Sequence, residues 1–124
     1  MLVDDDEDDR EIFLMIVSKA HPTLTISIAT NGEDALQQLQ NATNLPDMIF
    51  LDLNMPLMNG RELMQALKAD VRLKRIPTII LTTSSHGPTI NELKALGAKD
   101  FITKPDKYST WEKMLNDLFL NPPL

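Results

Sequence analysis

The sequence predicts an α/β fold in which a parallel sheet of five strands is covered by five helices on its two faces. Two observations lead to this prediction. Short apolar segments typical of strands alternate five times with longer segments whose apolar residues recur at helical spacing. In addition, residues 48–53 (MIFLDL) are apolar except for one aspartate, which is typical of a parallel strand buried on both faces.

The first half of the chain contains three predicted strands and two predicted helices. The first strand, residues 1–3, is a stub, and we expect a frayed N-terminus there. A helix follows and ends at His21-Pro22, and residues 25–29 alternate like a second strand. Asn31 is the predicted N-cap of the second helix, and residues 48–53 form the third strand. The apolar positions of the two helices are Ile12, Phe13, Ile16, Val17 and Ala20, then Ala35, Leu36 and Leu39.

The second half continues the alternation with three helices and two strands. The fourth strand covers residues 77–83, and the fifth covers residues 100–103. Gly97 closes the fourth helix, because glycine readily takes the left-handed conformation that ends a helix. The apolar positions are Leu63, Met64 and Leu67 in the third helix, Ile90, Leu93 and Leu96 in the fourth, and Trp111, Met114, Leu115, Leu118 and Phe119 in the last. The last set follows helical spacing and predicts one apolar face.

Composition excludes several classes of function. The net charge of −6 argues against a nucleic-acid partner, which would need a basic face. No apolar run is long enough to span a membrane, and residues at the N-terminus lack the basic and then apolar pattern of a secretion signal, so we expect neither feature. There is no cysteine, so a disulfide framework and a thiolate metal site are excluded, in keeping with a cytoplasmic location. We therefore expect neither nucleic acid nor membrane among the partners.

Polar residues follow four of the five strands at the point where each strand ends. The first strand is followed by Asp4 and Asp5, the third ends at Asp52, the fourth contains Thr82, and Lys104 follows the fifth. In open parallel sheets, ligands bind beyond the carboxyl ends of the strands, so these side chains should meet at one edge. The second strand, which we expect at the border of the sheet, delivers neither a carboxylate nor an amine there.

This set of residue types suits phosphoryl transfer. Clustered carboxylates repel one another unless a cation neutralises them, and Mg²⁺ prefers such oxygen ligands. A threonine hydroxyl and a lysine ammonium can each bind a phosphoryl oxygen, and positioning with charge neutralisation is most of what phosphoryl transfer requires. Asp52 can be the nucleophile and form an aspartyl phosphate, which explains a carboxylate at the end of a buried strand.

Taken together, these motifs closely resemble the receiver domain of two-component response regulators, over the whole chain. The segments that carry the resemblance are LVDDD (2–6), FLDLNMPLMNG (50–60), IILTTS (79–84) and GAKDFITKP (97–105). The resemblance implies a flavodoxin-like, doubly wound sheet with strand order 2-1-3-4-5. It also implies a single receiver domain over residues 1–124 without an output domain, of the stand-alone, chemotaxis-receiver-like type. Within that type, the segment DLNMPLMNGREL (52–63) resembles the bacterial group associated with phytochromes.

The resemblance assigns a role to each site residue. Asp52 is the phosphoacceptor, assisted by Thr82 and Lys104. Mg²⁺ is bound by Asp5, by Asp52 and by the backbone carbonyl of Asn54, with Asp4 acting through water. Thr82 and Phe101 are the switch pair, although an aromatic in a strand is as often an ordinary core residue. The bond between Lys104 and Pro105 is expected to be cis. Asp6, Glu7, Asp8 and Asp9 are given no role beyond an acidic helix start.

The implied function is signal transduction. A sensor histidine kinase or a histidine phosphotransfer protein donates a phosphoryl group to Asp52, and the surface formed by the fourth helix, fifth strand and fifth helix changes its affinity for a downstream protein. The protein would be a cytoplasmic phosphoprotein, a monomer or a homodimer favoured by phosphorylation. It would not be an enzyme, beyond assisting its own Mg²⁺-dependent phosphorylation and dephosphorylation.

Two alternatives come from other classes of function. One is a phosphatase of the haloacid-dehalogenase type, which also uses an aspartate nucleophile with Mg²⁺. Such enzymes carry a second acid two positions later, where this chain has Asn54, which cannot act as a general acid. The other is an interaction module that kept the fold and works without phosphate. Degenerate receivers usually lose the acceptor, an acid or the lysine, and all of these residue types are present here.

Overall fold

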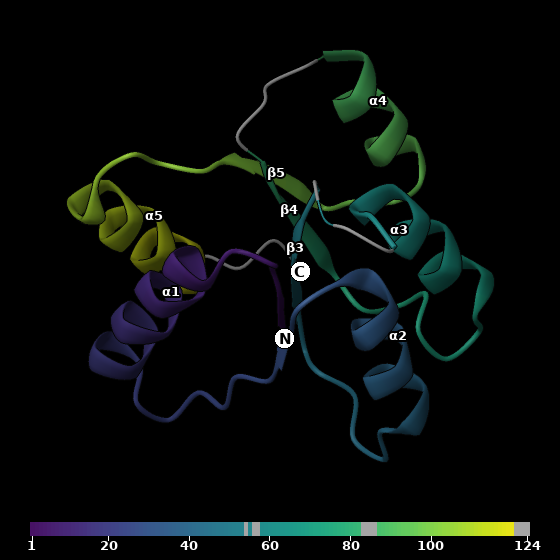
Figure 1. Ribbon diagram of the computed structural model, residues 1–124, viewed down its shortest axis with the longest axis horizontal. Coiled ribbons are helices and arrows are strands. Elements are labelled where there is room, and N and C mark those ends of the chain that lie inside the picture. The colour runs from purple at the N-terminus through teal and green to yellow at the C-terminus, as the bar shows by residue number, and fades with distance from the viewer. Residues whose placement is uncertain (54, 56–57, 83–86, 121–124) are drawn as a thin grey trace.

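The computed structural model describes residues 1–53, 55, 58–82 and 87–120, with only the backbone of residues 87–89. Its core is a parallel sheet of five strands in the order β2-β1-β3-β4-β5, which confirms the predicted flavodoxin-like topology (Figure 1). The strands are β1 (Leu2–Val3), β2 (Ile28–Ala29), β3 (Ile49–Asp52), β4 (Thr78–Thr82) and β5 (Asp100–Thr103). Both β3 and β4 are buried along their whole length, and for β3 the continuous apolar pattern of residues 48–53 predicted this.

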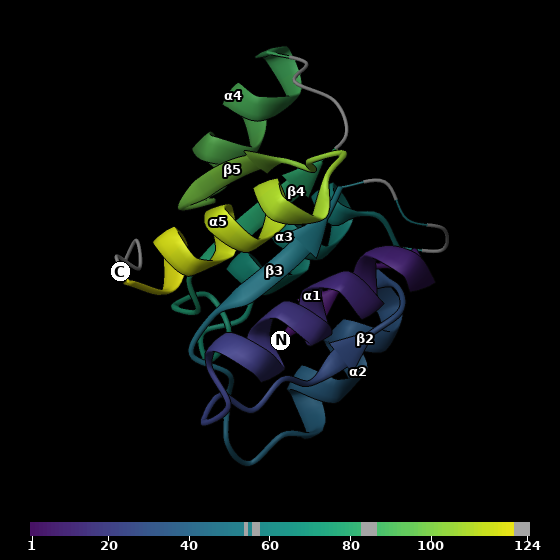
Figure 2. The same cartoon turned by 90° about the vertical axis from the view of Figure 1, so that its left-hand side faces the viewer.

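Helices cover both faces of this sheet. They are α1 (Glu7–Ala20), α2 (Gly32–Asn41), α3 (Gly60–Ala69), α4 (Gly87–Ala95) and α5 (Tyr108–Leu120). One face carries α1 and α5, and the other carries α2, α3 and α4 (Figures 1 and 2). Alternate strand residues enter the two cores, so Phe50 packs with α1 and α5 whereas Leu51 packs with α2 and α3. In the described part of the chain, no helix has the length and apolar character that a membrane span requires.

The predicted helix boundaries are confirmed where a specific residue sets them. Asn31 caps α2 by accepting a hydrogen bond from the Asp34 amide, and α1 ends at His21. Gly97 follows α4 with a φ of 104°, a conformation that L side chains rarely adopt. On α5, Trp111 and Leu115 lie fully in the core, as their spacing predicted.

The first two strands are both short. The length of β1 agrees with the predicted stub, whereas β2 is shorter than the predicted strand. β1 contains only Leu2 and Val3, yet both are buried and pair with β2 on one side and β3 on the other. Because Leu2 is paired with Ile28, residues 25–27 have no strand β1 alongside them, and β2 is reduced to Ile28–Ala29 instead of residues 25–29.

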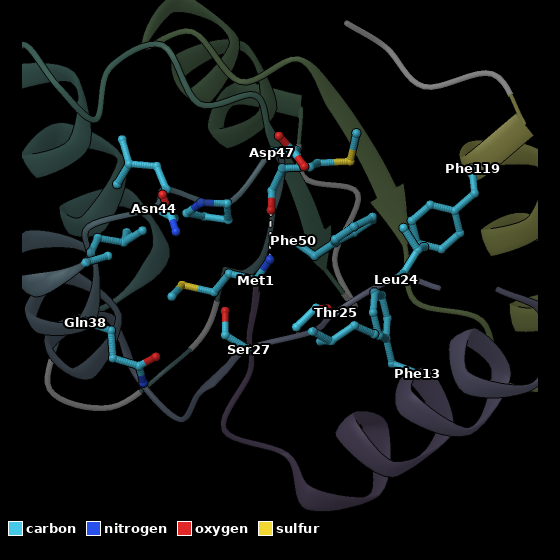
Figure 3. A pocket seen from close by; sticks show the side chains of 16 residues that line it. Met1, Phe13, Leu24, Thr25, Ser27, Gln38, Asn44, Asp47, Phe50 and Phe119 are labelled. Carbon is cyan, nitrogen blue, oxygen red and sulfur yellow. Dashed lines mark hydrogen bonds between the residues drawn. The ribbon is translucent and has the colours of Figure 1, made fainter. Parts of the chain in front are cut away.

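A cavity of about 620 Å³ lies at this amino end of the sheet, away from the carboxyl ends where the candidate site residues lie (Figure 3). Its wall combines aromatic side chains from both halves of the chain, Phe13, Phe50 and Phe119, with the start of the chain. The terminal amino group of Met1 donates a hydrogen bond of 2.8 Å to the Met48 carbonyl at its edge. The N-terminus is therefore tied to the residue before β3 in this structure.

Candidate functional site

Three carboxylates meet at the carboxyl ends of the two central strands β1 and β3. One carboxylate oxygen from each of Asp4, Asp5 and Asp52 lies within 4.8 Å of the others. Asp4 is 1% exposed and Asp52 is 5% exposed, whereas Asp5 faces solvent. The fold thus brings together the three acids that the sequence predicted, in a cluster that is buried on one side and open on the other.

Lys104 supplies the cationic group of this cluster. Its Nζ lies 3.0 Å from Asp4 Oδ2 and 3.5 Å from Asp52 Oδ1, and its side chain is 7% exposed. Burial by itself would lower the pKa of Lys104. Hydrogen bonds to Asp9 and Asp4, together with the charges of Asp4 and Asp52, outweigh that effect and raise the pKa above its usual value. Lys104 therefore stays an ammonium ion over the whole physiological range.

Thr82 is positioned by the pairing of β4 with its two neighbours. Leu81, the residue before it, lies opposite Asp52 in the register of β3 and β4, and Thr82 itself lies opposite Thr103. The Lys104 amide donates a hydrogen bond of 2.7 Å to the Thr82 carbonyl. Thr82 is buried at the carboxyl end of β4. The same strand end therefore fixes both the threonine and the backbone of the lysine.

Phe101 lies on β5, paired with Ile80, and is half-buried. It packs against the core between the sheet and the helices α2, α3 and α4, and the Lys94 ammonium lies 5.8 Å from its ring centroid. The structure thus places it as a partly exposed aromatic on the face next to α4. Its role as a switch residue stays a prediction.

Two further expectations for the site were not confirmed. The expectation of a cis bond between Lys104 and Pro105 is wrong, because no peptide bond in the described residues is cis. The trans isomer is the intrinsically favoured one for a proline by about 0.5–1 kcal/mol, and with it the Lys104 ammonium already reaches Asp4 and Asp52. Asn54, the expected carbonyl ligand, lies outside the described residues.

The acidic run 4–9 has a more detailed structure than the sequence predicted. Asp4 Oδ1 accepts a hydrogen bond of 2.9 Å from the Asp6 amide. Asp6 is the N-cap of α1 and accepts a hydrogen bond of 3.1 Å from the Asp9 amide. Arg10 donates to the Asp4 carbonyl at 3.0 Å. These contacts fix the turn that carries Asp4 and Asp5 to the end of β1.

Asp9 is one site residue whose role was not predicted from the sequence. Its Oδ2 lies 2.8 Å from Lys104 Nζ, closer than the Asp4 and Asp52 oxygens. A signal for it was present in the sequence. Asp9 precedes Phe13 and Ile16 by four and seven residues, so it lies in register with the buried face of α1 and points toward the sheet.

Gly60 is a second residue whose role in the site was not predicted. A Cβ on this residue would lie 2.9 Å from the Asp52 carbonyl oxygen and 2.9 Å from the Leu53 Cα. The Gly60 amide donates a hydrogen bond of 3.1 Å to the Leu53 carbonyl. The absence of a side chain at this position allows α3 to begin directly against the backbone that follows β3.

The acids fit a divalent cation that prefers oxygen ligands. Among the described residues, Lys104 forms ion pairs with Asp4, Asp9 and Asp52, and Asp5 is a fourth carboxylate next to Asp4 and Asp52, so negative charge remains in the cluster. Both Asp4 oxygens already accept hydrogen bonds or ion pairs from the protein, whereas Asp5 faces solvent. Mg²⁺ binds through few carboxylates and keeps several waters, so a cluster with one open side suits it.

Comparison with known proteins gives one consistent result. A family model described as the response regulator receiver domain matches residues 1–116. Among curated proteins, a protein-glutamate methylesterase/protein-glutamine glutaminase from Bacillus licheniformis is 35% identical over 105 residues. That alignment covers 85% of this chain but only 29% of the relative, so the chain spans less than a third of the relative's length.

Solved structures of similar length also match. The phosphorylated cyanobacterial phytochrome response regulator RcpA is 27% identical, with a TM-score of 0.88 over 97% of this chain and 91% of that chain. The Mn²⁺-bound form of the response regulator Rcp1 is 28% identical, with a TM-score of 0.82 over 98% of this chain and 93% of that chain. The matched family model and the two similar structures thus agree with the fold and with the carboxylate cluster described above.

Proposed function

Because the chain belongs to the response regulator receiver domain family, we propose that it carries a two-component signal by accepting a phosphoryl group on Asp52. The observation that supports this most strongly is the position of Asp52 itself. It ends a fully buried strand, within 4.8 Å of two further carboxylates and 3.5 Å from the Lys104 ammonium. Burial of a carboxylate next to other carboxylates reduces the stability of the folded protein, and a role as phosphoacceptor explains why Asp52 is nevertheless placed there.

The proposed reaction is the transfer of a phosphoryl group from a phosphohistidine of a sensor kinase or phosphotransfer protein. A carboxylate oxygen of Asp52 forms the new P–O bond as the P–N bond breaks. The other nitrogen of the phosphohistidine ring carries a proton when the bond breaks, so the electron pair of the P–N bond leaves with a neutral imidazole. The product is an aspartyl phosphate, and later attack of water on phosphorus releases inorganic phosphate and restores the carboxylate.

Lys104 and Thr82 would bind the phosphoryl oxygens. The Lys104 ammonium is held at the edge of the cluster by Asp4, and it can pair with one oxygen of the incoming group. The Thr82 hydroxyl, at the end of the neighbouring strand, can donate a hydrogen bond to another. Mg²⁺ bound by Asp5 and Asp52, with Asp4 acting through water, would neutralise the acids and the phosphoryl charge together.

The names of two relatives are consistent with this proposal. RcpA was solved in phosphorylated form, and Rcp1 was solved with Mn²⁺, a divalent ion that favours the same oxygen ligands as Mg²⁺. The partners that we propose are a histidine kinase or phosphotransfer protein upstream and a protein target downstream. The surface formed by α4, β5 and α5, with Phe101 at its edge, is the proposed output surface. A single receiver domain without an output domain and a cytoplasmic location stay predictions.

The test is phosphorylation by a small donor. The protein is incubated with phosphoramidate, once with Mg²⁺ and once with EDTA, and its intact mass is recorded. One added phosphoryl group that requires Mg²⁺ and is lost in Asp52→Asn is expected. A folded protein that gains no mass would contradict the proposal and favour the phosphate-independent interaction module. Turnover of phosphate monoesters would favour the phosphatase alternative.

A further inference from the structure

Lys104 is shared between the three clustered acids at the strand ends and a further carboxylate on α1. Its ammonium lies 2.8 Å from Asp9 Oδ2 but 3.5 Å from Asp52 Oδ1. Asp9 belongs to the first turn of α1 and is not one of the three clustered acids at the strand ends. The shortest ion pair of Lys104 in the described residues is therefore made with a helix residue and not with the proposed phosphoacceptor.

The position of Asp9 is fixed by the local structure. Its backbone amide is held by the Asp6 cap, and its side chain, 24% exposed, lies in register with the buried residues of α1. A hydrogen bond between the Asp9 carboxylate and the Lys104 ammonium joins α1 to the residue after β5, which are 95 positions apart in the sequence. Asp9 thus has little freedom to follow Lys104 if the ammonium moves.

From this geometry we propose that Asp9 is a positioning residue that holds Lys104 in the resting protein and competes with the phosphoryl group for it. The proposal rests on the proposed function, since it concerns the lysine of that site. A contact that stabilises the resting state more than the transition state raises the barrier to the reaction. When Asp52 is phosphorylated, Lys104 must give up part of its contact with Asp9 to pair with a phosphoryl oxygen.

Loss of the Asp9 carboxylate should therefore speed up phosphorylation. The expected increase for Asp9→Asn is about five-fold, which corresponds to about 1 kcal/mol, the upper end for a partly exposed ion pair. In the absence of a donor, the freed Lys104 should pair more closely with Asp4 and Asp52 and compete with Mg²⁺. The affinity for Mg²⁺ should therefore fall by a similar factor.

The experiment compares Asp9→Asn with Asp8→Asn and Asp9→Glu. Asp8 is the neighbouring residue and is exposed, so Asp8→Asn removes the same charge close to the site without the contact to Lys104. Asp9→Glu keeps a carboxylate and should return toward the wild-type rate. Phosphorylation by phosphoramidate is followed at saturating Mg²⁺, with breakage of the P–N bond and loss of ammonia. Circular dichroism verifies folding, and Asp9→Ser is the second variant.

Two readouts separate this proposal from the proposed function. Faster phosphorylation and weaker Mg²⁺ binding in Asp9→Asn than in Asp8→Asn would support the role of Asp9. Equal effects of the two substitutions, or slower phosphorylation in Asp9→Asn, would overturn it. If the wild-type protein accepts no phosphoryl group, the proposed function fails, but calorimetric titration with Mg²⁺ alone still decides whether Asp9 restrains Lys104. Equal Mg²⁺ affinities of the two variants would then overturn the proposal.

Discussion

Gly60, the first residue of α3, lies so close to Asp52 that a Cβ on the glycine would be 2.9 Å from the Asp52 carbonyl oxygen. Real Cβ atoms essentially never come this near to a backbone oxygen, and the oxygen belongs to a central strand that cannot easily shift. The start of a helix and the proposed phosphoacceptor are thus in direct backbone contact. The Asn59-Gly60 sequence therefore affects the position of Asp52 as well as the start of α3.

Gly60→Ala should destabilise the protein and slow its phosphorylation. The added methyl group must push the backbone at Asp52 and Leu53 away, and overpacking of this kind costs about 1–3 kcal/mol. Arg61→Ala, one residue later, is the control because it removes only an exposed ion pair with Glu92 and should change stability by less than about 1 kcal/mol. Urea unfolding and the rate of phosphorylation by phosphoramidate measure the two effects. Equal stabilities of the two variants would count against a tight contact.

Mg²⁺ should stabilise the protein through the clustered acids. A ligand that binds only the folded state adds about 2.7 kcal/mol to the free energy of unfolding at a concentration one hundred times its Kd. Asp5→Asn removes the exposed acid of the cluster, so the gain from Mg²⁺ should become much smaller at the same concentration. Asp8→Asn is the control and should keep most of the stabilisation by Mg²⁺. Thermal unfolding with Mg²⁺ and with EDTA gives the answer, and an unchanged gain in Asp5→Asn would argue against a metal site at Asp5.

The terminal amino group of Met1 should make stability depend on pH. Burial lowers its pKa from 8.0 to about 6, and the charge of Asp47 offsets only part of that effect. Between pH 6 and pH 8 the unfolded chain therefore binds more protons than the folded chain. The free energy of unfolding should rise with pH across this window, on the order of 2 kcal/mol in total, and it should level off below pH 6, where both states carry the proton, and above pH 8, where neither does.

N-terminal acetylation provides the control for this prediction. An acetylated Met1 has no titrating amine but keeps an N–H group that can donate to the Met48 carbonyl. Both histidines are unchanged in the acetylated protein, so their contributions cancel in the comparison. Urea unfolding at several pH values should therefore show a larger rise in the free energy of unfolding between pH 6 and pH 8 for the unmodified protein than for the acetylated protein. A rise of the same size in both forms would mean that another group causes it.

Most of the fold could be predicted because the apolar pattern is strong where burial is complete. Residues 48–53 predicted a buried strand, and β3 is buried from Ile49 to Asp52. Asn31 and Gly97 predicted their helix boundaries through local backbone preferences. The extent of β2 could not be predicted, because it depends on a partner strand. Residues 25–27 have strand-like composition, but β1 begins opposite Ile28.

For the site, the sequence predicted that the strand-end acids, the threonine and the lysine meet, but it did not predict the contact of Asp9 with that lysine. Because ligands bind beyond the carboxyl ends of parallel strands, the sequence predicted one shared edge for the residues at those ends, and the structure places them there: Asp4, Asp5, Asp52, Thr82 and Lys104. The contact between Asp9 and Lys104 joins two residues 95 positions apart, and it depends on the rotation of α1 about its axis. The expectation of a cis bond before Pro105 came from the resemblance to the receiver family, and the trans isomer in this structure is the one that a proline bond intrinsically favours, by about 0.5–1 kcal/mol.

The measurement that tests the central claim most directly is the location of the phosphoryl group. The protein is treated with phosphoramidate and Mg²⁺ and then reduced with borohydride, which converts a phosphorylated aspartate to homoserine, and its peptides are sequenced by mass spectrometry. Homoserine at position 52, and an unchanged aspartate there when EDTA replaces Mg²⁺, is the predicted result. Homoserine at Asp4, Asp5 or Asp9 with an intact Asp52 would contradict the assignment of Asp52 as the phosphoacceptor.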